Sequence, residues 1–382
     1  MRLADCHNVD RLRALARRRL PAPIFHYIDG AADDEVTARR NVAAFEDCDL
    51  VPNVLANVAE PDLSVTVLGQ KLEMPLFCSP TAIQRLFHHE GEAAVARAAA
   101  RFGTMCGVSS LSTFALSEVA AASRGPKMFQ FYFHKDRGLN QALLEQAKAA
   151  QFDVLALTVD TITGGNRERD LRTGFTSPPR LSWRSALSFA LHPNWTLNYL
   201  LRRKFDLPAL QAHVQEGTSI AISIGEYFST MLDARMDWDD AARLREAWGR
   251  PFCLKGVMSA ADARRAVALG ADAIMLSNHG GRQLDGGRAP LDQLAEIVDA
   301  VGGQIEIILD GGIRRGTHVL KALAAGATAC SGGRFYLYAL GAAGQPGVEK
   351  TLANMQAEIR RGMQLMGVSR LSELQPSMLR WR

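Results

Sequence analysis

Short runs of apolar and β-branched residues recur along the chain, separated by segments rich in Ala, Leu and charged residues. The runs are typical of buried parallel strands, and the segments between them are typical of amphipathic helices. The predicted strands are 75–80, 104–109, 128–133, 154–160, 251–257, 273–279, 305–312 and 327–333. The clearest predicted helices are 91–102, 139–150, 259–270 and 316–326, of which the last two end in Gly, a frequent helix C-cap.

Eight strands that alternate with helices predict an α/β fold, the TIM (β/α)8 barrel. We expect one barrel domain over 1–382, with an N-terminal helical segment at 1–74 and a C-terminal helical segment at 335–382. Successive strand starts are 22 to 32 residues apart, but the fourth and fifth are 97 apart. This excess predicts an insertion over 171–235 in the fourth βα loop, at the end of the barrel where active sites form.

Polar, ionisable or Gly-rich positions stand at almost every predicted strand end. Buried polar groups need partners, so their gathering at one end of a barrel predicts a ligand site. The side chains concerned are Gln130, Tyr132, Thr158, Asp160, Arg167, Lys255, Ser277, His279, Arg282, Asp310, Arg314 and Arg334.

The last two of these loops have the composition of a phosphate site. Gly311 and Gly312 are followed by Arg314, and Gly333 is followed by Arg334. Glycines let the backbone approach a phosphate, and arginines supply positive charge. The alternative is that the glycines only turn two tight loops.

His279 and Arg282 are the most specific pair of candidates. A base that removes a proton and a cation that holds a carboxylate must be neighbours if the substrate is a small acid. Asp160 and Arg167 end a strand that faces the same predicted pocket. A histidine that is hydrogen-bonded only for structure is the alternative, and these neighbours favour the catalytic interpretation.

Composition and charge exclude several classes of protein. The chain is 47% apolar and 22% charged, with a net charge of +4, which is ordinary for a globular enzyme and gives no reason to expect a nucleic-acid partner. None of the six cysteines has C-x-x-C spacing, so we expect free thiols in a reducing compartment. No metal is expected either, because His88-His89-Glu90 precedes a predicted helix and has no further ligand at suitable spacing.

Membrane crossing and secretion are not expected from the pattern. No stretch of about 18 apolar residues occurs. Residues 1–19 form a basic predicted helix rather than a signal peptide. The cytoplasm is the expected location.

Several motifs together resemble one family. SNHGGRQLDG (277–286) is similar to the signature around the catalytic histidine of the FMN-dependent L-2-hydroxy acid dehydrogenase/oxidase family. Supporting matches follow in the family's order: LPAPIFHYIDGAADDE (20–35), SPTA (79–82), FQFY (129–132), LTVD (157–160), NRERD (166–170), LKGV (254–257), DGGIRRG (310–316) and GGR (332–334). The resemblance covers nearly the whole chain.

The resemblance implies a catalytic and substrate-binding set. It makes His279 the base that acts on the substrate's α-carbon or hydroxyl, and Asp160 the group that orients it. Arg167 and Arg282 would bind the substrate carboxylate, to which a planar guanidinium is better matched than an ammonium. Tyr27 and Tyr132 would hydrogen-bond the carboxylate and the hydroxyl.

The resemblance also implies FMN as the cofactor. Lys255 would stabilise the negative charge that builds up near N1 of the reduced flavin. The remaining cofactor-binding positions would be Thr81, Ala82, Ser109, Gln130, Thr158, Ser277, Asp310, Gly311, Gly312, Arg314, Gly333 and Arg334. The implied reaction is oxidation of an L-2-hydroxy acid, foremost L-lactate, with mandelate or another acid as the alternative. A homo-oligomer, commonly a tetramer in this family, is implied as well.

The composition of the insertion indicates which electron acceptor the protein uses. Residues 171–205 contain no Asp or Glu but many Arg, aromatic and Leu residues. This combination is typical of a segment that lies at an anionic membrane surface, here the cytoplasmic face of the inner membrane. Members of the family with such a segment pass electrons to quinone. A basic lid packed on its own barrel or on a neighbouring subunit is the alternative.

Three other functions remain open at this point. One is an oxygen-using 2-hydroxy acid oxidase that makes hydrogen peroxide. Another is an FMN barrel enzyme that acts on a phosphate ligand, but this would leave Arg167, His279 and Arg282 unexplained as a group. The third is a flavin-binding protein without activity, in which the base or the carboxylate-binding arginines should have been lost.

Overall fold

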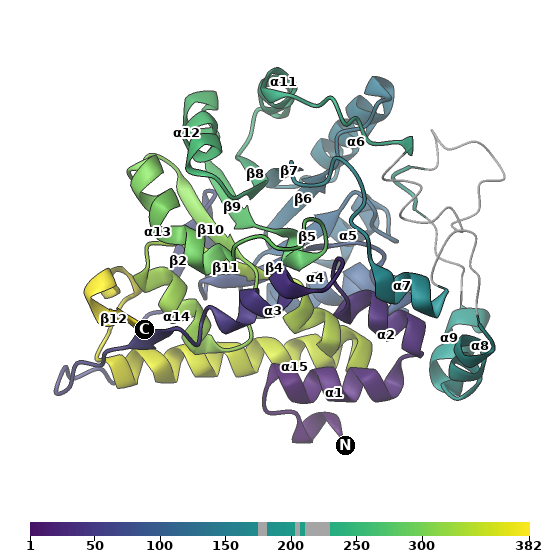
Figure 1. The fold of residues 1–382 in the computed structure, drawn as a ribbon, viewed down its shortest axis with the longest axis horizontal. Coiled ribbons are helices and arrows are strands. Elements are labelled where there is room, and N and C mark those ends of the chain that lie inside the picture. Colours follow the sequence, from purple (N-terminus) through teal and green to yellow (C-terminus); the bar gives the residue numbers. More distant parts are fainter. Residues whose placement is uncertain (175–181, 203–206, 211–229) are drawn as a thin grey trace.

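Eight parallel strands close into a barrel in the computed structural model, which describes residues 1–174, 182–202, 207–210 and 230–382 (Figure 1). The strands are β4 (Leu76–Thr81), β5 (Cys106–Ser109), β6 (Lys127–Phe131), β7 (Val154–Thr158), β8 (Phe252–Val257), β9 (Ala273–Ser277), β10 (Glu306–Asp310) and β11 (Ala329–Gly332). β11 pairs with β4 and completes the circle. The predicted TIM barrel is confirmed, with one strand inside or nearly inside each of the eight predicted runs.

Four strands end two residues earlier than the sequence predicts, namely β6, β7, β9 and β10. The residues after them leave the hydrogen-bonded ladder and turn into the loops. His279, for instance, has φ +57°, which no strand residue adopts. The polar positions at these strand ends therefore belong to loops, which can aim them into a common space.

Helices surround the barrel (Figure 1). They are α4 (Gly91–Arg101), α5 (Leu116–Ala122), α6 (Arg137–Ala149), α11 (Trp238–Trp248), α12 (Ala260–Leu269), α13 (Pro290–Val301), α14 (Gly316–Ala324) and α15 (Arg334–Met366). Their ends are set by local chemistry: the Asp136 side chain accepts hydrogen bonds from two amides at the start of α6, and Gly270 ends α12 in the left-handed conformation. The four helices named from the sequence correspond to α4, α6, α12 and α14.

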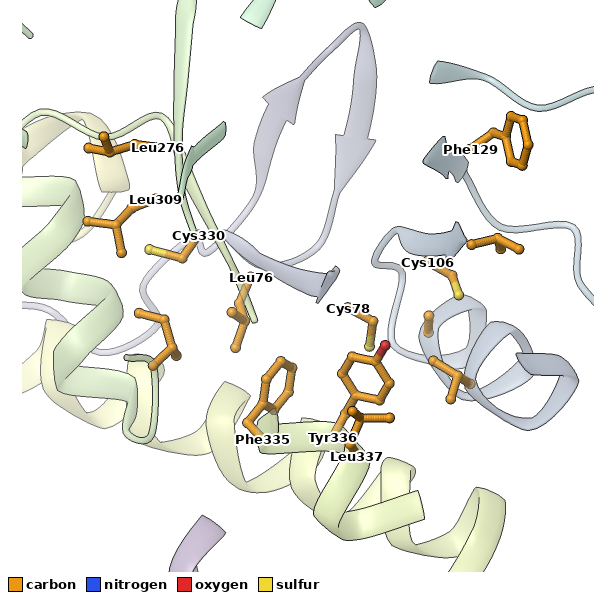
Figure 2. Close-up of a cluster of buried hydrophobic side chains, with 14 of the residues drawn as sticks. Leu76, Cys78, Cys106, Phe129, Leu276, Leu309, Cys330, Phe335, Tyr336 and Leu337 are labelled. Atoms are coloured by element: carbon orange, nitrogen blue, oxygen red, sulfur yellow. The ribbon is translucent and has the colours of Figure 1, made fainter. Parts of the chain in front are cut away.

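Alternate strand residues fill the barrel and contact the surrounding helices. Phe77, Met128 and Met275 belong to a cluster of buried side chains in the barrel interior. The β2–β3 hairpin (Val65–Val67 and Gln70–Leu72) contributes apolar side chains to the same cluster. Figure 2 shows the outward-pointing set, with Leu76 and Cys78 beside Phe335 and Tyr336 of α15. All six cysteines are buried and free, as expected.

The two ends of the chain pack together below the barrel. α1 (Val9–Arg19) lies along α15, followed by α2 (Ala22–Asp29) and α3 (Val36–Ala43) (Figure 1). The end segments expected to be helical also contain short strands: β1 (Cys48–Leu50) pairs with β12 (Leu379–Trp381), and the β2–β3 hairpin lies within 1–74. Three-residue strands are too short to produce an alternating pattern. Short 3₁₀ turns occupy Leu3–Asp5, Gln84–Leu86, His279–Gly281, Leu371–Glu373 and Pro376–Met378.

The insertion between β7 and α11 contributes α7 (Glu168–Thr173), α8 (Trp183–Ala190) and α9 (Pro193–Leu201). α8 and α9 form a pair beside α2 (Figure 1). The pair is fastened to the barrel by Trp195, whose indole N–H donates to the Leu86 carbonyl at 2.9 Å, and by Ser188, whose hydroxyl accepts from the Ala22 amide at 2.9 Å. Parts of the predicted basic segment, 175–181 and 203–206, lie outside the described residues.

α8 and α9 turn a set of large apolar side chains to solvent. We call this set the apolar face: Trp183, Leu187, Leu191, Leu197, Leu200 and Leu201. Within the described part of the chain, no helix combines the length and the hydropathy needed to cross a membrane.

Candidate active site

A cavity opens at the carboxyl ends of the barrel strands and gathers almost all of the predicted site residues. Those that line it are Tyr27, Thr81, Ala82, Ser109, Gln130, Tyr132, Thr158, Arg167, Lys255, His279, Arg282, Asp310, Gly311, Gly312, Arg314, Gly333 and Arg334. Asp160 and Ser277 do not line the cavity and stand behind residues that do. Asp160 contacts His279, and Ser277 contacts Lys255.

His279 projects from a tight turn directly after β9. Its Nδ1 lies 3.0 Å from Oδ1 of Asp160 and 3.3 Å from the Thr161 hydroxyl. Nε2 makes no hydrogen bond to the part of the chain that the structure describes, which leaves it for a ligand in the cavity. The second carboxylate oxygen of Asp160, Oδ2, is buried without a hydrogen-bond partner among the described residues. Oδ1 contacts His279 and also accepts a hydrogen bond from the Thr161 hydroxyl at 2.9 Å.

The electrostatics of this pair suit a general base. Burial alone would raise the pKa of Asp160, but His279 and Lys255 outweigh burial and hold that pKa below its ordinary value. Burial lowers the pKa of His279, although Asp160 acts in the opposite direction. The imidazole is thus neutral near pH 7 and can accept a proton, while the ionised carboxylate stabilises the imidazolium that results.

Arg282 and Arg167 form a cationic pair over the ring of Tyr27. Their guanidinium carbons lie 4.9 Å and 5.8 Å from the centre of that ring. Nη1 of Arg282 donates to the carbonyls of Tyr27 and Gly30 at 2.7 and 2.9 Å, so the guanidinium is fixed in place. Burial, followed by the charge of Arg167, lowers the pKa of Arg282 to about 10. Two half-buried like charges beside each other favour the binding of an anion between them.

Lys255 is held as a buried cation. Its ammonium lies 3.0 Å from Asp310, which also accepts hydrogen bonds from Ser277 and Ser331 at 2.8 and 2.9 Å. Burial would lower the pKa of Lys255, but Asp310 and Asp160 raise it above the ordinary value. A fixed positive charge therefore lines the cavity.

Three buried side chains form a hydrogen-bonded row on neighbouring strands. The Ser109 hydroxyl donates to Oε1 of Gln130, and Nε2 of Gln130 donates to the Thr158 hydroxyl, both at 2.8 Å. The row presents donors and acceptors in fixed positions along one wall. Tyr132 lies nearby, and burial, together with Asp160, raises the pKa of its phenol, so the group stays protonated and can donate.

At the Gly-rich end of the cavity, packing also restricts the residue type. Gly312 has φ +75°, and a Cβ there would overlap the carbonyl oxygen of Asn41. The glycine is thus required for packing against α3. Arg334 donates to the carbonyls of Ile28, Gly280 and Gly30 at 3.0, 2.7 and 2.7 Å. It joins α2 to the loop of the catalytic histidine, and both Arg334 and Arg314 also line the cavity.

Sequence reasoning missed the contribution of α3. Asn41 lines the cavity and exchanges two hydrogen bonds of 2.7 Å with Asn278, the residue before the histidine. Asp285 accepts from the Thr37 amide at 2.7 Å and thereby caps the start of α3. These partners are more than 230 residues apart, and no local pattern signals them. Phe87, which also lines the cavity, was missed for the same reason.

The His88-His89-Glu90 cluster lies before α4, as predicted. Candidate ligand atoms of the three residues lie within 4.8 Å of one another. Glu90 is the N-cap position of α4, and its carboxylate forms an ion pair with Arg97 at 3.0 Å. The pattern agrees with the interpretation as a helix start.

Comparison with known proteins identifies the class that this barrel and site define. The model of the family described as FMN-dependent dehydrogenase matches residues 16–381. The chain belongs to this family of FMN-dependent 2-hydroxy acid dehydrogenases.

Among its relatives, the L-lactate oxidase of Nostoc sp. is 42% identical over 381 residues, covering 97% of both chains. The L-lactate dehydrogenase of Xanthomonas euvesicatoria pv. vesicatoria is 42% identical over 363 residues, covering 95% of this chain and 93% of that one. A crystal structure of the monotopic membrane protein (S)-mandelate dehydrogenase matches with a TM-score of 0.93 and 34% identity, over 99% of this chain and 100% of that one. The activity is FMN-dependent oxidation of L-2-hydroxy acids.

The donor set of the cavity fits FMN. The flavin ring of FMN carries alternating hydrogen-bonding groups at its edge. The Ser109–Gln130–Thr158 row and the cation of Lys255 match these groups. A terminal phosphate is matched by the Gly-rich loops and by the guanidinium of Arg314 at the other end.

Proposed function

We propose that this chain oxidises L-lactate to pyruvate with His279 as the base, and passes the electrons to a membrane quinone. The observation that carries the catalytic part is the meeting of a neutral, carboxylate-oriented histidine and two half-buried arginines in one cavity. A base and an anion-binding pair are what removal of a proton from a small hydroxy acid requires. When bound, FMN supplies the two-electron acceptor for this oxidation.

Each side chain then has a distinct task. Arg282 and Arg167 bind the substrate carboxylate, and Tyr27 donates a hydrogen bond to the same carboxylate. Tyr132 donates to the substrate hydroxyl, because its phenol stays protonated. Nε2 of His279 accepts the proton, and Asp160 stabilises the charge that this creates. The other residues of the cavity, with Ser277 and Asp310 behind Lys255, hold the cofactor.

Replacement of the base tests this assignment. In His279→Ala, FMN should remain bound, because Nε2 faces the substrate, while the rate of anaerobic flavin bleaching by L-lactate should fall by at least about 1000-fold. D-lactate serves as the control substrate and should not bleach the wild-type enzyme. Bleaching of His279→Ala at near the wild-type rate would exclude His279 as the base.

The quinone part of the proposal rests on the insertion. α8 and α9 expose the apolar face, and Leu201 within it is 80% exposed. Arg184 and Arg202 lie on the same helix pair, and the sequence from 171 to 205 has no acidic residue. Apolar side chains flanked by cations favour binding at an anionic membrane surface, which would make the protein peripheral. The TM-score of 0.93 with a monotopic membrane protein, against 0.84 with a mandelate oxidase, supports this choice.

Sedimentation with vesicles tests membrane binding. We expect the holoenzyme to sediment with vesicles that contain phosphatidylglycerol, and the double variant Leu200→Asp/Leu201→Asp to stay in solution. The matched control is Leu365→Asp, which alters an equally exposed leucine on α15, 69% exposed and outside the apolar face. Equal binding of all three proteins would refute the docking role of α9.

Oxygen is the second candidate acceptor, because an L-lactate oxidase is 42% identical to this chain. Peroxide formation by the lactate-reduced enzyme in air, compared with its rate of quinone reduction, decides between the two. A faster reaction with oxygen would make the protein an oxidase.

A further inference from the structure

A second cavity lies between the insertion and the barrel. It has a volume of about 660 Å³ and is bounded by α9, the end of α1 and the bend of α15 near Ala343. Phe87 lines both this cavity and the cofactor cavity. The ring of Phe87 stacks on Tyr27, with the ring centres 6.0 Å apart. The two cavities therefore share a wall next to the substrate position.

The outer wall of the second cavity is aromatic and apolar. The rings of Trp195 and Tyr199 stack with their centres 5.0 Å apart and their planes 10° from parallel. Leu191 lines the cavity and also belongs to the apolar face, where it is 69% exposed. The rim of the cavity is thus continuous with the surface proposed to contact lipid. A ligand dissolved in the membrane could enter without crossing water.

The polar groups of this cavity are cationic or neutral donors. Arg19, Arg85 and Arg202 line it together with His88 and His89, and no Asp or Glu does so among the residues that the structure describes. Burial, together with His89, lowers the pKa of His88 to about 4, so this imidazole is neutral at pH 7. Arginines favour the build-up of negative charge on a bound oxygen, and neutral imidazoles can hydrogen-bond it.

We propose that this cavity binds the head group of the lipid-soluble quinone that reoxidises the enzyme. The inference rests on the proposed quinone-reducing function. Trp195 and Tyr199 hold the planar ring, and the arginines offset the charge that forms on its oxygens. The quinone accepts the two electrons and two protons that the hydroxy acid gives up, so that L-lactate and quinone become pyruvate and quinol.

The alternative ligand is the head group of an anionic phospholipid, which the arginines would also attract. Two observations favour the quinone. The stacked aromatic pair is suited to a flat ring. The wall shared through Phe87 brings the ligand close to the cofactor cavity, which electron transfer requires and lipid binding does not.

A pair of neighbouring substitutions on α9 tests the proposal. Asn198 lines the cavity and is exposed, so Asn198→Phe should fill the space without disturbing the core. Leu197→Phe is the matched control, because Leu197 lies on the apolar face and does not line the cavity. The probe is ubiquinone with one isoprene unit, added to the holoenzyme. Its binding is followed by quenching of tryptophan fluorescence, and Trp195→Phe assigns the signal among the five tryptophans.

We expect Asn198→Phe to raise both the Kd and the KM for this quinone by at least about tenfold. Anaerobic flavin reduction by L-lactate should stay within about twofold of wild type in both variants. Equal quinone affinity of Asn198→Phe and wild type overturns the proposal. If Asn198→Phe instead weakens sedimentation with phosphatidylglycerol vesicles while its quinone affinity is unchanged, the cavity is assigned to a lipid and the proposal is overturned as well. If L-lactate fails to reduce the flavin while the quinone still binds, the proposed substrate fails and the cavity assignment stands.

Discussion

Gly256 of β8 occupies a position where the structure leaves no room for a side chain. Its φ is +109°, and the register of β8 against β9 shifts between Lys255 and Val257. A Cβ at this position would lie 2.6 Å from both Cβ and Cγ of Asp160 and 2.9 Å from its Oδ2. The glycine thus makes the space into which the carboxylate behind His279 fits, and we expect Gly256→Ala to displace that carboxylate.

Two costs follow from the geometry. A non-glycine residue in this backbone conformation is strained by about 1–3 kcal/mol, which should lower the free energy of unfolding by that amount. Displacement of Asp160 by about 1 Å would break the 3.0 Å contact to Nδ1 of His279, and errors of that size in an active site lower rates by up to about 100-fold. The expected result is a moderately less stable enzyme with a much slower chemical step.

Urea unfolding and anaerobic stopped-flow bleaching of the flavin by L-lactate measure the two effects separately. Gly69→Ala is the matched control: Gly69 also has positive φ, +72°, but a Cβ there would meet no atom within 4 Å. The Gly69→Ala enzyme should be less stable than wild type but should keep the wild-type bleaching rate. If Gly256→Ala bleaches as fast as Gly69→Ala, then either Asp160 is not displaced or its contact with His279 is not needed.

Three further predictions follow from the site. Asp160→Asn removes the charge that raises the pKa of His279, so this pKa should fall further. The maximal bleaching rate should drop by about 1000-fold or more. The acid limb of the pH profile of bleaching should move to lower pH. Arg282→Lys keeps the charge but loses the planar fork, and the L-lactate concentration for half-maximal bleaching should rise about 10- to 100-fold. Asp310→Ala leaves Lys255 buried without its partner, and urea unfolding should show a loss of about 3–5 kcal/mol. A wild-type value in any of these measurements would contradict the corresponding contact.

The barrel and most of its site could be predicted because both depend on local signals. Buried parallel strands are continuous apolar runs, and the residues after them meet at one face whatever their spacing in the chain. The position of Tyr27 came only from family resemblance, since nothing local indicates that a helix at 22–29 reaches the mouth of the barrel. Asn41 and Phe87 escaped notice because only tertiary packing brings them to the cavity. Four strands were predicted to end two residues too late, because the apolar pattern does not indicate the last residue that is hydrogen-bonded to a neighbouring strand.

The arrangement of α2 has a consequence for how the protein is made. Its carbonyls are held by Arg282, 255 residues after Tyr27, and by Arg334, 306 residues after Ile28. At about 5–20 residues per second, α2 leaves the ribosome roughly 15–60 s before Arg334 is synthesised. During this interval Phe25 lacks Tyr338 of α15, on which it stacks in the folded chain, although its contact with Arg13 of α1 can form. The substrate side of the site is therefore among the last parts to form, and a chain cut short before α15 would carry its base and most of its cofactor contacts but an unanchored Tyr27.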